Sequence, residues 1–437
     1  MSTSTHAPSG SGGGGDRATE RAGRDRRAGG GEALAGRVLM ITENKSVPAD
    51  RRVWNEARTL AAAGWEVTIV SPAEPGLEQP GREVREGVEI HRFQLHPSAG
   101  GVAGYLREYS QAVWRIRGIV RRLAEERRFD VVHASNPPDF LLLAARSARR
   151  RGASFVFDHH DLGPELYRTR FADGGRALEL AMLAVERLAF RMADVTLASN
   201  ETYREVALRR GRMRPENVFV VRNGPDLRRF RPTDPDPALR RGRGHLLAYV
   251  GVMGPQDGID HALRALAWLR GRRTDWHAIF AGAGEVMGQM RALASELALD
   301  GHVEFAGWLG DRELRSLLST ADVCIAPDPP SPFNDVSTMI KLSEYMAMGR
   351  PVVGYDLAES RATAGDAALY ADDPEGLGRC LERLLSDPAR RERMGALAAE
   401  RAASDLGWEH AERSLLAAYD RALARSALRA APAATTA

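Results

Sequence analysis

The sequence is poor in lysine, cysteine and long apolar runs. Only Lys45 and Lys341 are lysines among its 61 lysine and arginine residues. The two cysteines, Cys324 and Cys380, lie in apolar segments without metal-ligand spacing, which favours a reducing, cytoplasmic compartment. No run approaches the roughly 18 apolar residues that a membrane helix needs. The start of the chain lacks an apolar core, so we expect no secretory signal there.

The remaining composition is that of a globular protein. The chain has 437 residues, of which 43% are hydrophobic, enough for large cores in two or three domains. The net charge of +3 and a pI near 9.0 do not by themselves indicate nucleic acid, and we expect no such partner. Residues 1–35 are rich in glycine, serine and arginine, so we expect a disordered tail, with a second tail at 426–437.

Short apolar segments alternate with helix-like segments along the rest of the chain. This pattern predicts an α/β fold in which parallel sheets are covered on both faces. The alternation runs over 36–225, stops in a segment rich in proline and charge at 226–244, and restarts over 245–405. We therefore predict two Rossmann-like, doubly wound domains that face each other across a cleft. A C-terminal helix at 406–425 is expected to pack back toward the first domain.

Ligands of such sheets bind at the carboxyl ends of the strands. In the second domain, the segment "FNDVSTMIKLSEYMAMGRPVV" carries the strongest signal. Asp335, Ser337 and Thr338 are suitable N-cap residues for a helix that starts near residue 339, where free amides favour an anion. Lys341 and Glu344 are three residues apart and share a helix face. A nucleotide fits this pattern, although a surface lysine–glutamate pair is a common alternative.

Glycines and a polar cluster mark two further places. Gly251 follows a strand, and Gly282 and Gly284 lie in "FAGAGE" between a strand and a helix, which suits a phosphate-binding turn and tight packing equally well. In the first domain, "FVFDHHDLGPELY" places five polar residues after a buried strand, which favours a functional site over a structural histidine. They are Asp158, His159, His160, Asp161 and Glu165. His159 should point away from His160 and contribute less.

From about residue 37 to residue 423 the chain resembles the glycosyltransferases of family 4, which have the two-domain GT-B fold. The matching segments are "HDL", "NGPDLRRFRP", "YVGVMGPQDGIDHALRAL", "FAGAGE", "VEFAGWL" and "EYMAMGRPVV", in the order of the family. The segments "NPPDF", "FDHHDLGPELY" and "SPFNDVSTMIKLSEYMAMG" resemble a subgroup that builds bacterial surface polysaccharides.

The resemblance implies a nucleotide diphosphate sugar as donor and retention of the anomeric configuration. It implies that Glu344 binds the donor ribose and that His160, with Asp161 and His159 as further catalytic candidates, lies beside the transferred sugar. The earlier glutamate of the family's pair is replaced by Val336, and its phosphate-binding basic residues are replaced at two positions. These are Val252 and Asp257. We therefore expect Lys341 to neutralise the diphosphate.

The first strand–helix loop, "ENKSVPADRRVW", lacks the family's glycine pair, and we expect Lys45, Arg51, Arg52 and, further along, Glu165 on the acceptor side. The sequence thus predicts a retaining hexosyl- or N-acetylhexosaminyltransferase of cell-envelope or exopolysaccharide biosynthesis, acting on a glycan or lipid-linked acceptor. No cofactor and no metal are expected, because amides, lysine and arginine can neutralise the diphosphate.

The arginine-rich segment 102–128 suits a peripheral contact with the inner face of the membrane as well as a helix packed on the sheet. Two other functions stay open at this point: an epimerase or hydrolase on the same architecture, and a non-catalytic protein that binds sugar nucleotides.

Overall fold

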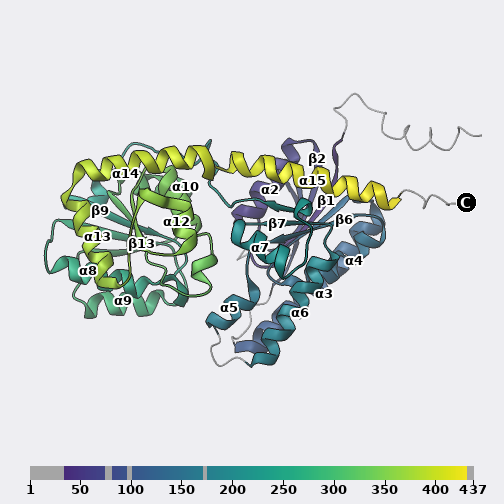
Figure 1. Cartoon of the computed structure of the whole chain (residues 1–437), viewed down its shortest axis with the longest axis horizontal. Helices are drawn as coiled ribbons and strands as arrows, with labels where there is room; N and C mark the ends of the chain where they lie inside the picture. Colours follow the sequence, from purple (N-terminus) through teal and green to yellow (C-terminus); the bar gives the residue numbers. More distant parts are fainter. Residues whose placement is uncertain (1–33, 74–80, 96–100, 171–174, 431–437) are drawn as a thin grey trace, which may run out of the picture.

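The computed structural model describes residues 34–73, 81–95, 101–170 and 175–430. The tails predicted at 1–35 and 426–437 lie largely outside these residues. Figure 1 shows two α/β lobes side by side, joined along one side by the C-terminal helices. Each lobe has its own sheet, as the alternation of the sequence predicts.

The N-terminal domain is built on an eight-stranded sheet with the order β3-β4-β2-β1-β5-β6-β7-β8. Its pairs are parallel except for the edge pair of β3 and β4. The strands are β1 (Gly36–Ile41), β2 (Trp65–Pro72), β3 (Arg82–Arg85), β4 (Val88–Phe93), β5 (Val131–Ser135), β6 (Ser154–His159), β7 (Val195–Ala198) and β8 (Val218–Val220). The central strands are buried on both faces, which explains why they are apolar runs and not alternating patterns.

Helices cover this sheet. They are α2 (Arg51–Ala62), α3 (Gly101–Glu126), α4 (Leu142–Arg150), α5 (Gly163–Arg170), α6 (Arg176–Met192) and α7 (Glu201–Arg209). The start of α2 positions the site described below. Asp50 caps it, since its side chain accepts a hydrogen bond from the backbone amide of Val53. The buried Val53, Ala57 and Leu60 then lie on one face, four and three residues apart, and fix the helix on the sheet.

The C-terminal domain has a six-stranded sheet in the order β11-β10-β9-β12-β13-β14, parallel throughout. Its strands are β9 (His245–Val250), β10 (Trp276–Ala281), β11 (Val303–Gly307), β12 (Val323–Ala326), β13 (Val352–Tyr355) and β14 (Ala368–Ala371). Its helices are α8 (Ile259–Arg270), α9 (Met287–Glu296), α10 (Asp311–Thr320), α11 (Ile340–Ala347), α12 (Ala358–Ala364), α13 (Pro374–Ser386) and α14 (Pro388–Arg401). The α/β prediction with two parallel-sheet domains is confirmed.

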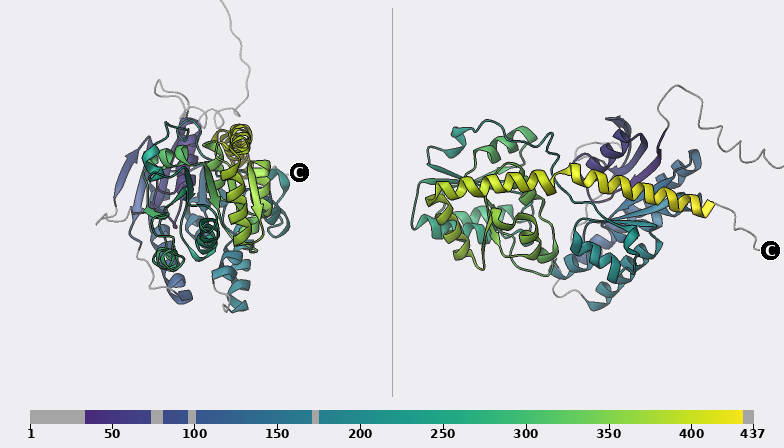
Figure 2. Two further views of the ribbon diagram at one scale, coloured as in Figure 1. Left: turned by 90° about the vertical axis from the view of Figure 1, so that its left-hand side faces the viewer. Right: turned by 45° about the horizontal axis from the view of Figure 1, so that its top comes forward.

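The C-terminal end of the chain crosses from one domain to the other. Helix α14 lies on the C-terminal domain, a π-helical turn follows at Ala402–Leu406, and α15 (Trp408–Ala430) covers the N-terminal sheet (Figure 2). Leu415, Tyr419 and Ala422 of α15 are fully buried in the core of the N-terminal domain. The helix predicted to end near residue 425 therefore runs to Ala430. The C-terminal helix completes the cover of a sheet formed some 200 residues earlier in the sequence.

Candidate active site at the interdomain boundary

The loop after β6 presents His160 with its backbone held in place. The side-chain oxygen of Asn136 accepts hydrogen bonds from the amides of His160 at 2.9 Å and Asp161 at 3.1 Å. The amide nitrogen of Asn136 donates to the carbonyl oxygen of Asp161 at 2.7 Å. Asn136 follows the neighbouring strand β5, so two adjacent strand ends build one rigid loop. Sequence reasoning missed Asn136, although its place at the end of a strand in "NPPDF" was a usable signal.

The imidazole of His160 is paired with a buried carboxylate. Its Nδ1 lies 3.0 Å from Oδ2 of Asp158, and its side chain stays 18% exposed while Asp158 has no exposed surface. Arg52 donates to both carboxylate oxygens of Asp158, at 2.6 and 2.9 Å, and to the carbonyl of Val221 at 2.7 Å. This two-point contact fixes the orientation of Asp158, and so of His160.

The position of Arg52 corrects the sequence prediction. Arg52 was expected on the acceptor side, but its side chain is only 2% exposed. A buried guanidinium needs a carboxylate partner, and the strand end supplies one. Arg52 is therefore a residue that positions Asp158 and does not face an acceptor.

The charges of this group are coupled. Burial would raise the pKa of Asp158, but Arg52 and His160 hold it well below its usual value. Burial also opposes the charged form of His160, yet Asp158 and Asp161 outweigh it and raise the pKa of His160 to about 9. The imidazole is therefore a cation at neutral pH, with Nδ1–H directed at Asp158.

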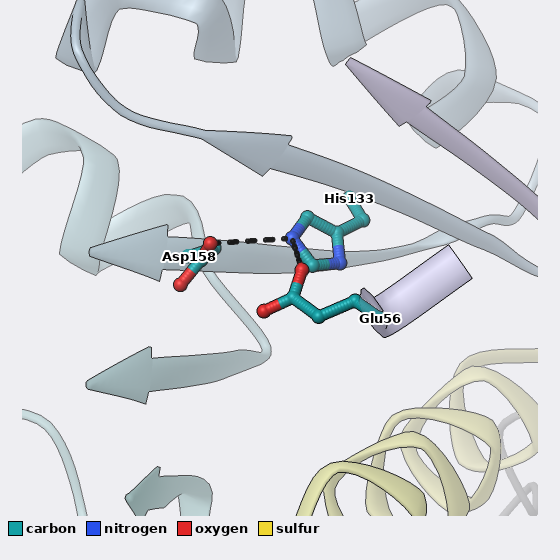
Figure 3. A group of neighbouring side chains, drawn as sticks. All are labelled: Glu56, His133 and Asp158. Atoms are coloured by element: carbon teal, nitrogen blue, oxygen red, sulfur yellow. Dashed lines mark ion pairs between the residues drawn. The ribbon is translucent and has the colours of Figure 1, made fainter. Parts of the chain in front are cut away.

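Beneath this pair lies a buried group of three potential metal ligands, Glu56, His133 and Asp158 (Figure 3). Nε2 of His133 lies 3.6 Å from Glu56 and 3.9 Å from Asp158. The guanidinium of Arg52 contacts both carboxylates, since its Nε also lies 3.3 Å from Glu56. A second cation would meet this guanidinium at close range, so the arrangement fits a charge network and not a metal centre.

This network extends to the C-terminal helix. Nδ1 of His133 lies 2.8 Å from the hydroxyl oxygen of Tyr419 in α15. Burial raises the pKa of Glu56 well above its usual value and lowers that of His133. Burial thus disfavours the charged forms of both groups, whereas Arg52 and His160 stabilise the charged form of Asp158.

His159 and Glu165 lie away from this group. His159 is fully buried among aromatic rings, and its Nε2 lies 3.3 Å from Glu186. Arg210 bridges Glu186 at 2.7 Å and Glu165 at 2.8 Å. Adjacent strand residues point to opposite faces, so the side chain of His159 points away from that of His160. Because it is fully buried, a substrate cannot reach it in this structure. We assign it to packing, in place of the catalytic role considered from the sequence.

In the C-terminal domain, Glu344 lies on α11 and is 9% exposed, with an N-terminal-domain residue as its partner. Arg51, the first residue of α2, donates from Nη1 to Oε1 of Glu344 at 2.6 Å. Its Nη2 also lies 3.4 Å from Asp311. Burial raises the pKa of Glu344, and Arg51 opposes that shift. Arg51 was expected on the acceptor side, and it instead faces the residue expected to bind the donor.

Lys341 has carboxylate partners of its own. Its Nζ donates to Oδ1 of Asp328 at 2.7 Å and lies 3.8 Å from Asp257, with the ring of Tyr249 at 5.0 Å. Burial would lower the pKa of Lys341, but Asp328 and Asp257 raise it above the usual value. The crowded space beside Gly251 suits a compact ammonium, which explains the choice of lysine over arginine. Its predicted contact with a diphosphate stays a prediction.

The predicted N-caps of α11 are not caps. The N-cap is Met339, whose side chain makes no capping bond. Asp335 accepts from the amide of Ala358 at 2.9 Å. Ser337 donates to the carbonyl of Phe333 at 2.6 Å. Neither side chain is available to cap α11, because Asp335 lies inside a short 3₁₀ helix (Asn334–Val336) and bonds to the start of α12, while Ser337 bonds back to the residue before that 3₁₀ helix.

Thr338 instead joins the two domains. Its Oγ1 accepts from the side-chain amide of Asn200 at 2.8 Å, and that amide also donates to the carbonyl of Val336 at 3.0 Å. Thr202 donates to Glu359 at 2.7 Å nearby. With the Arg51–Glu344 pair, these contacts connect loops at the carboxyl ends of strands in both sheets, so the boundary between the domains carries the candidate site.

The turn after β10, which contains Gly282 and Gly284, allows the backbone to pack closely. A Cβ atom on Gly282, whose φ is +133°, would lie 1.8 Å from the carbonyl oxygen of Gly251. One on Gly284 would lie 2.4 Å from the carbonyl oxygen of Met253. The amide of Gly282 already donates to the carbonyl of Gly307 at 2.7 Å. Of the two alternatives left open by the sequence, the structure supports packing for Gly282.

Lys45 lies in the loop after β1 and is exposed. Its charge and that of His160 counteract the burial that raises the pKa of Asp161. The sequence prediction that Lys45 lies on the acceptor side is compatible with this position and stays a prediction.

Comparisons with known proteins identify the family of the two domains. A model of the glycosyl transferase 4-like domain matches residues 49–224, and a model of glycosyl transferases group 1 matches residues 244–387. The chain belongs to glycosyltransferase family 4. The two matches coincide with the two α/β domains, so each half of this glycosyltransferase carries its own domain signature.

Curated relatives are similar along most of their length. A D-inositol 3-phosphate glycosyltransferase of Salinispora tropica is 28% identical over 399 residues, which cover 84% of this chain and 80% of the relative. A GDP-mannose-dependent alpha-(1-6)-phosphatidylinositol dimannoside mannosyltransferase of Mycobacterium tuberculosis is 28% identical, over 69% of this chain and 76% of the relative.

Solved structures show the same fold. Sucrose-phosphate synthase of Thermosynechococcus elongatus superimposes with a TM-score of 0.72 at 19% identity, covering 89% of this chain and 100% of that chain. HepE of Anabaena, solved with UDP-glucose, gives 0.65 at 16% identity, covering 88% of this chain and 99% of that chain. The predicted GT-B fold is therefore confirmed.

Proposed function

We propose that the glycosyltransferase moves a hexosyl or N-acetylhexosaminyl group, with retention, from a nucleotide diphosphate sugar to a glycan or lipid-linked acceptor of the cell envelope. One observation carries the proposal. Two consecutive residues at the start of α2 contact the two halves of the site. Arg52 donates hydrogen bonds to Asp158, the partner of His160, and Arg51 donates to Glu344. The reacting sugar beside His160 and the ribose at Glu344 would then belong to one ligand.

The chemistry follows from the charges. Departure of the nucleoside diphosphate leaves negative charge on the bridging oxygen, which a fixed cation stabilises without reorganisation. The imidazolium of His160, held at Nδ1 by Asp158, is such a cation, and in this proposal its Nε2–H meets the departing oxygen. We propose that the reaction needs no metal, and dialysis against a chelator should leave turnover unchanged.

The relatives guide the choice of acceptors. The names of the two curated relatives contain D-inositol 3-phosphate and phosphatidylinositol dimannoside, and HepE was solved with UDP-glucose. A thermal-shift screen of nucleotide sugars comes first, because a ligand at 100 times its dissociation constant adds about 2.7 kcal/mol. The selected donor is then incubated with inositol 3-phosphate, lipid-linked sugars and glycans.

The decisive variants are His160→Gln and its neighbour His159→Gln. His160→Gln should abolish most turnover while the donor dissociation constant stays within a few-fold, because the imidazole faces the sugar and not the nucleotide. His159→Gln, which retains a hydrogen-bonding group toward Glu186, should keep turnover. Consumption of donor without any acceptor product would instead favour a hydrolase or epimerase, and binding without turnover would favour a non-catalytic protein.

We further propose that the outer face of α3 contacts an anionic membrane surface. Trp114 is 77% exposed there, and Arg107, Arg117 and Arg121 are exposed on the same helix. Leu143 of the adjacent α4 is also exposed. An exposed aromatic residue flanked by arginines suits the interface of acidic lipids. Among the helices of the described residues, none has the length and apolar character to cross a membrane.

A further inference from the structure

The C-terminal half of the candidate donor site is short of positive charge. Lys341 is accompanied by Asp328 at 2.7 Å and Asp257 at 3.8 Å, and Glu344 lies one turn further along the same helix. This group of four side chains therefore contains one ammonium and three carboxylates. An anionic diphosphate brought to this group of four side chains alone would be repelled, because its ammonium is already paired with the buried Asp328 and lies near the partly exposed Asp257.

The N-terminal domain supplies a cation at this position. Arg51 reaches across the boundary to Glu344 at 2.6 Å, although its side chain remains 50% exposed. Its second neighbour, Asp311, is 83% exposed and 3.4 Å away, which makes that contact weak. The strong contact of Arg51 is therefore with the carboxylate that the proposed donor ribose would use.

We propose that Arg51 is the diphosphate-binding residue of the donor site and that Glu344 holds it in place until the donor arrives. The inference rests on the proposed function, since it assumes a nucleotide diphosphate sugar as ligand. When ribose hydroxyls bind Glu344, they displace the guanidinium from the carboxylate. The freed group is then beside the nucleotide, where it forms a forked contact with phosphate oxygens.

The fold explains how one residue serves both states. Arg51 is the first residue of α2, and the cap at Asp50 and the buried Arg52 fix the backbone on either side of it. Only the side chain has to move, from Glu344 to a neighbouring phosphate. The exchange also keeps Glu344 paired in both states, which matters because a buried carboxylate without a partner is costly.

Calorimetry with three ligands tests the proposal: a nucleoside, its diphosphate and the sugar nucleotide selected by the thermal-shift screen. Arg51→Ala should weaken binding of the diphosphate by about ten- to a hundred-fold, as expected for a charge-assisted contact. Binding of the bare nucleoside should be unchanged or tighter, because the ribose no longer competes with a guanidinium for Glu344. Arg51→Lys should restore part of the diphosphate affinity.

Arg312→Ala is the matched control, since it removes an exposed cation next to Asp311 on α10 to which no role in the site is assigned. It should change diphosphate affinity less than about three-fold. An equal loss in Arg312→Ala would overturn the proposal in favour of a general positive field. An Arg51→Ala variant that binds the diphosphate as tightly as wild type, or loses nucleoside and diphosphate equally, would also overturn it. If wild type binds no nucleotide at all, the proposed function itself fails.

Discussion

The charge on His160 makes the stability of this protein depend on pH in a way that can be measured. The perturbation is His160→Gln, which keeps a hydrogen-bond donor toward Asp158 but removes the titrating group. The folded state raises the pKa of His160 from 6.5 to about 9. A raised pKa means that the stabilisation is fully present below the unfolded value and is lost as pH rises through about 9.

The size of the effect follows from the shift. The difference between 6.5 and about 9 corresponds to roughly 3 kcal/mol of unfolding free energy. The contacts that produce it are the 3.0 Å approach of Nδ1 to Asp158 and the burial of that carboxylate. We take the free energy of unfolding of wild type minus that of the variant. This difference should be about 3 kcal/mol larger at about pH 6 than at about pH 10.

Urea unfolding at these two pH values measures the difference, and NMR of the imidazole Cε1–H, assigned by its loss in the variant, gives the pKa directly. Titrating groups that do not interact with His160 change both proteins equally and cancel. A difference between wild type and variant that does not depend on pH, or an imidazole that titrates at or below 6.5, would refute the argument that Asp158 holds His160 as a cation.

Three further predictions concern the rest of the molecule. Lys341→Met should lower the free energy of unfolding by roughly 3–5 kcal/mol in urea titrations, because Asp328 stays buried without its partner; a loss below about 1 kcal/mol would mark a surface-like pair. Gly282→Ala should lower the melting temperature in calorimetry, since the new methyl group meets the carbonyl of Gly251, and an unchanged melting temperature would contradict the packing role. Trp114→Ser should reduce co-sedimentation with vesicles of anionic phospholipid, whereas equal binding of variant and wild type would exclude this helix face.

Much of the architecture could be predicted from local patterns of apolar residues in the sequence. Buried parallel strands have to be apolar on both faces, so runs such as "RVLMI" and "FVF" can be predicted as strands from the sequence. The rule that ligands lie at the carboxyl ends of strands then directed attention to the loops of His160 and Glu344. In the structure both side chains lie in those loops or on the helix that follows.

The hydrogen-bonding and ionic partners of the site residues could not be predicted from the sequence. The sequence indicated that Lys341 is unusual, but only the fold shows Asp328 and Asp257 beside it, from the loops after β12 and β9. Asp335 and Ser337 are residue types that cap helices, yet Asp335 accepts from the amide of Ala358 and Ser337 donates to the carbonyl of Phe333. Local propensity does not reveal which of several possible hydrogen bonds a loop selects.

The sequence by itself determined the two α/β domains, the loops that carry chemistry and the family, because these depend on periodicity and on short motifs. The tertiary structure alone decided what the consecutive arginines at the start of α2 do. Arg51 and Arg52 are identical in type and adjacent, but one helical step of about 100° directs one toward Glu344 of the other domain and the other into the core toward Asp158. Burial and the available carboxylates, which lie 293 and 106 residues away in the chain, separate their roles.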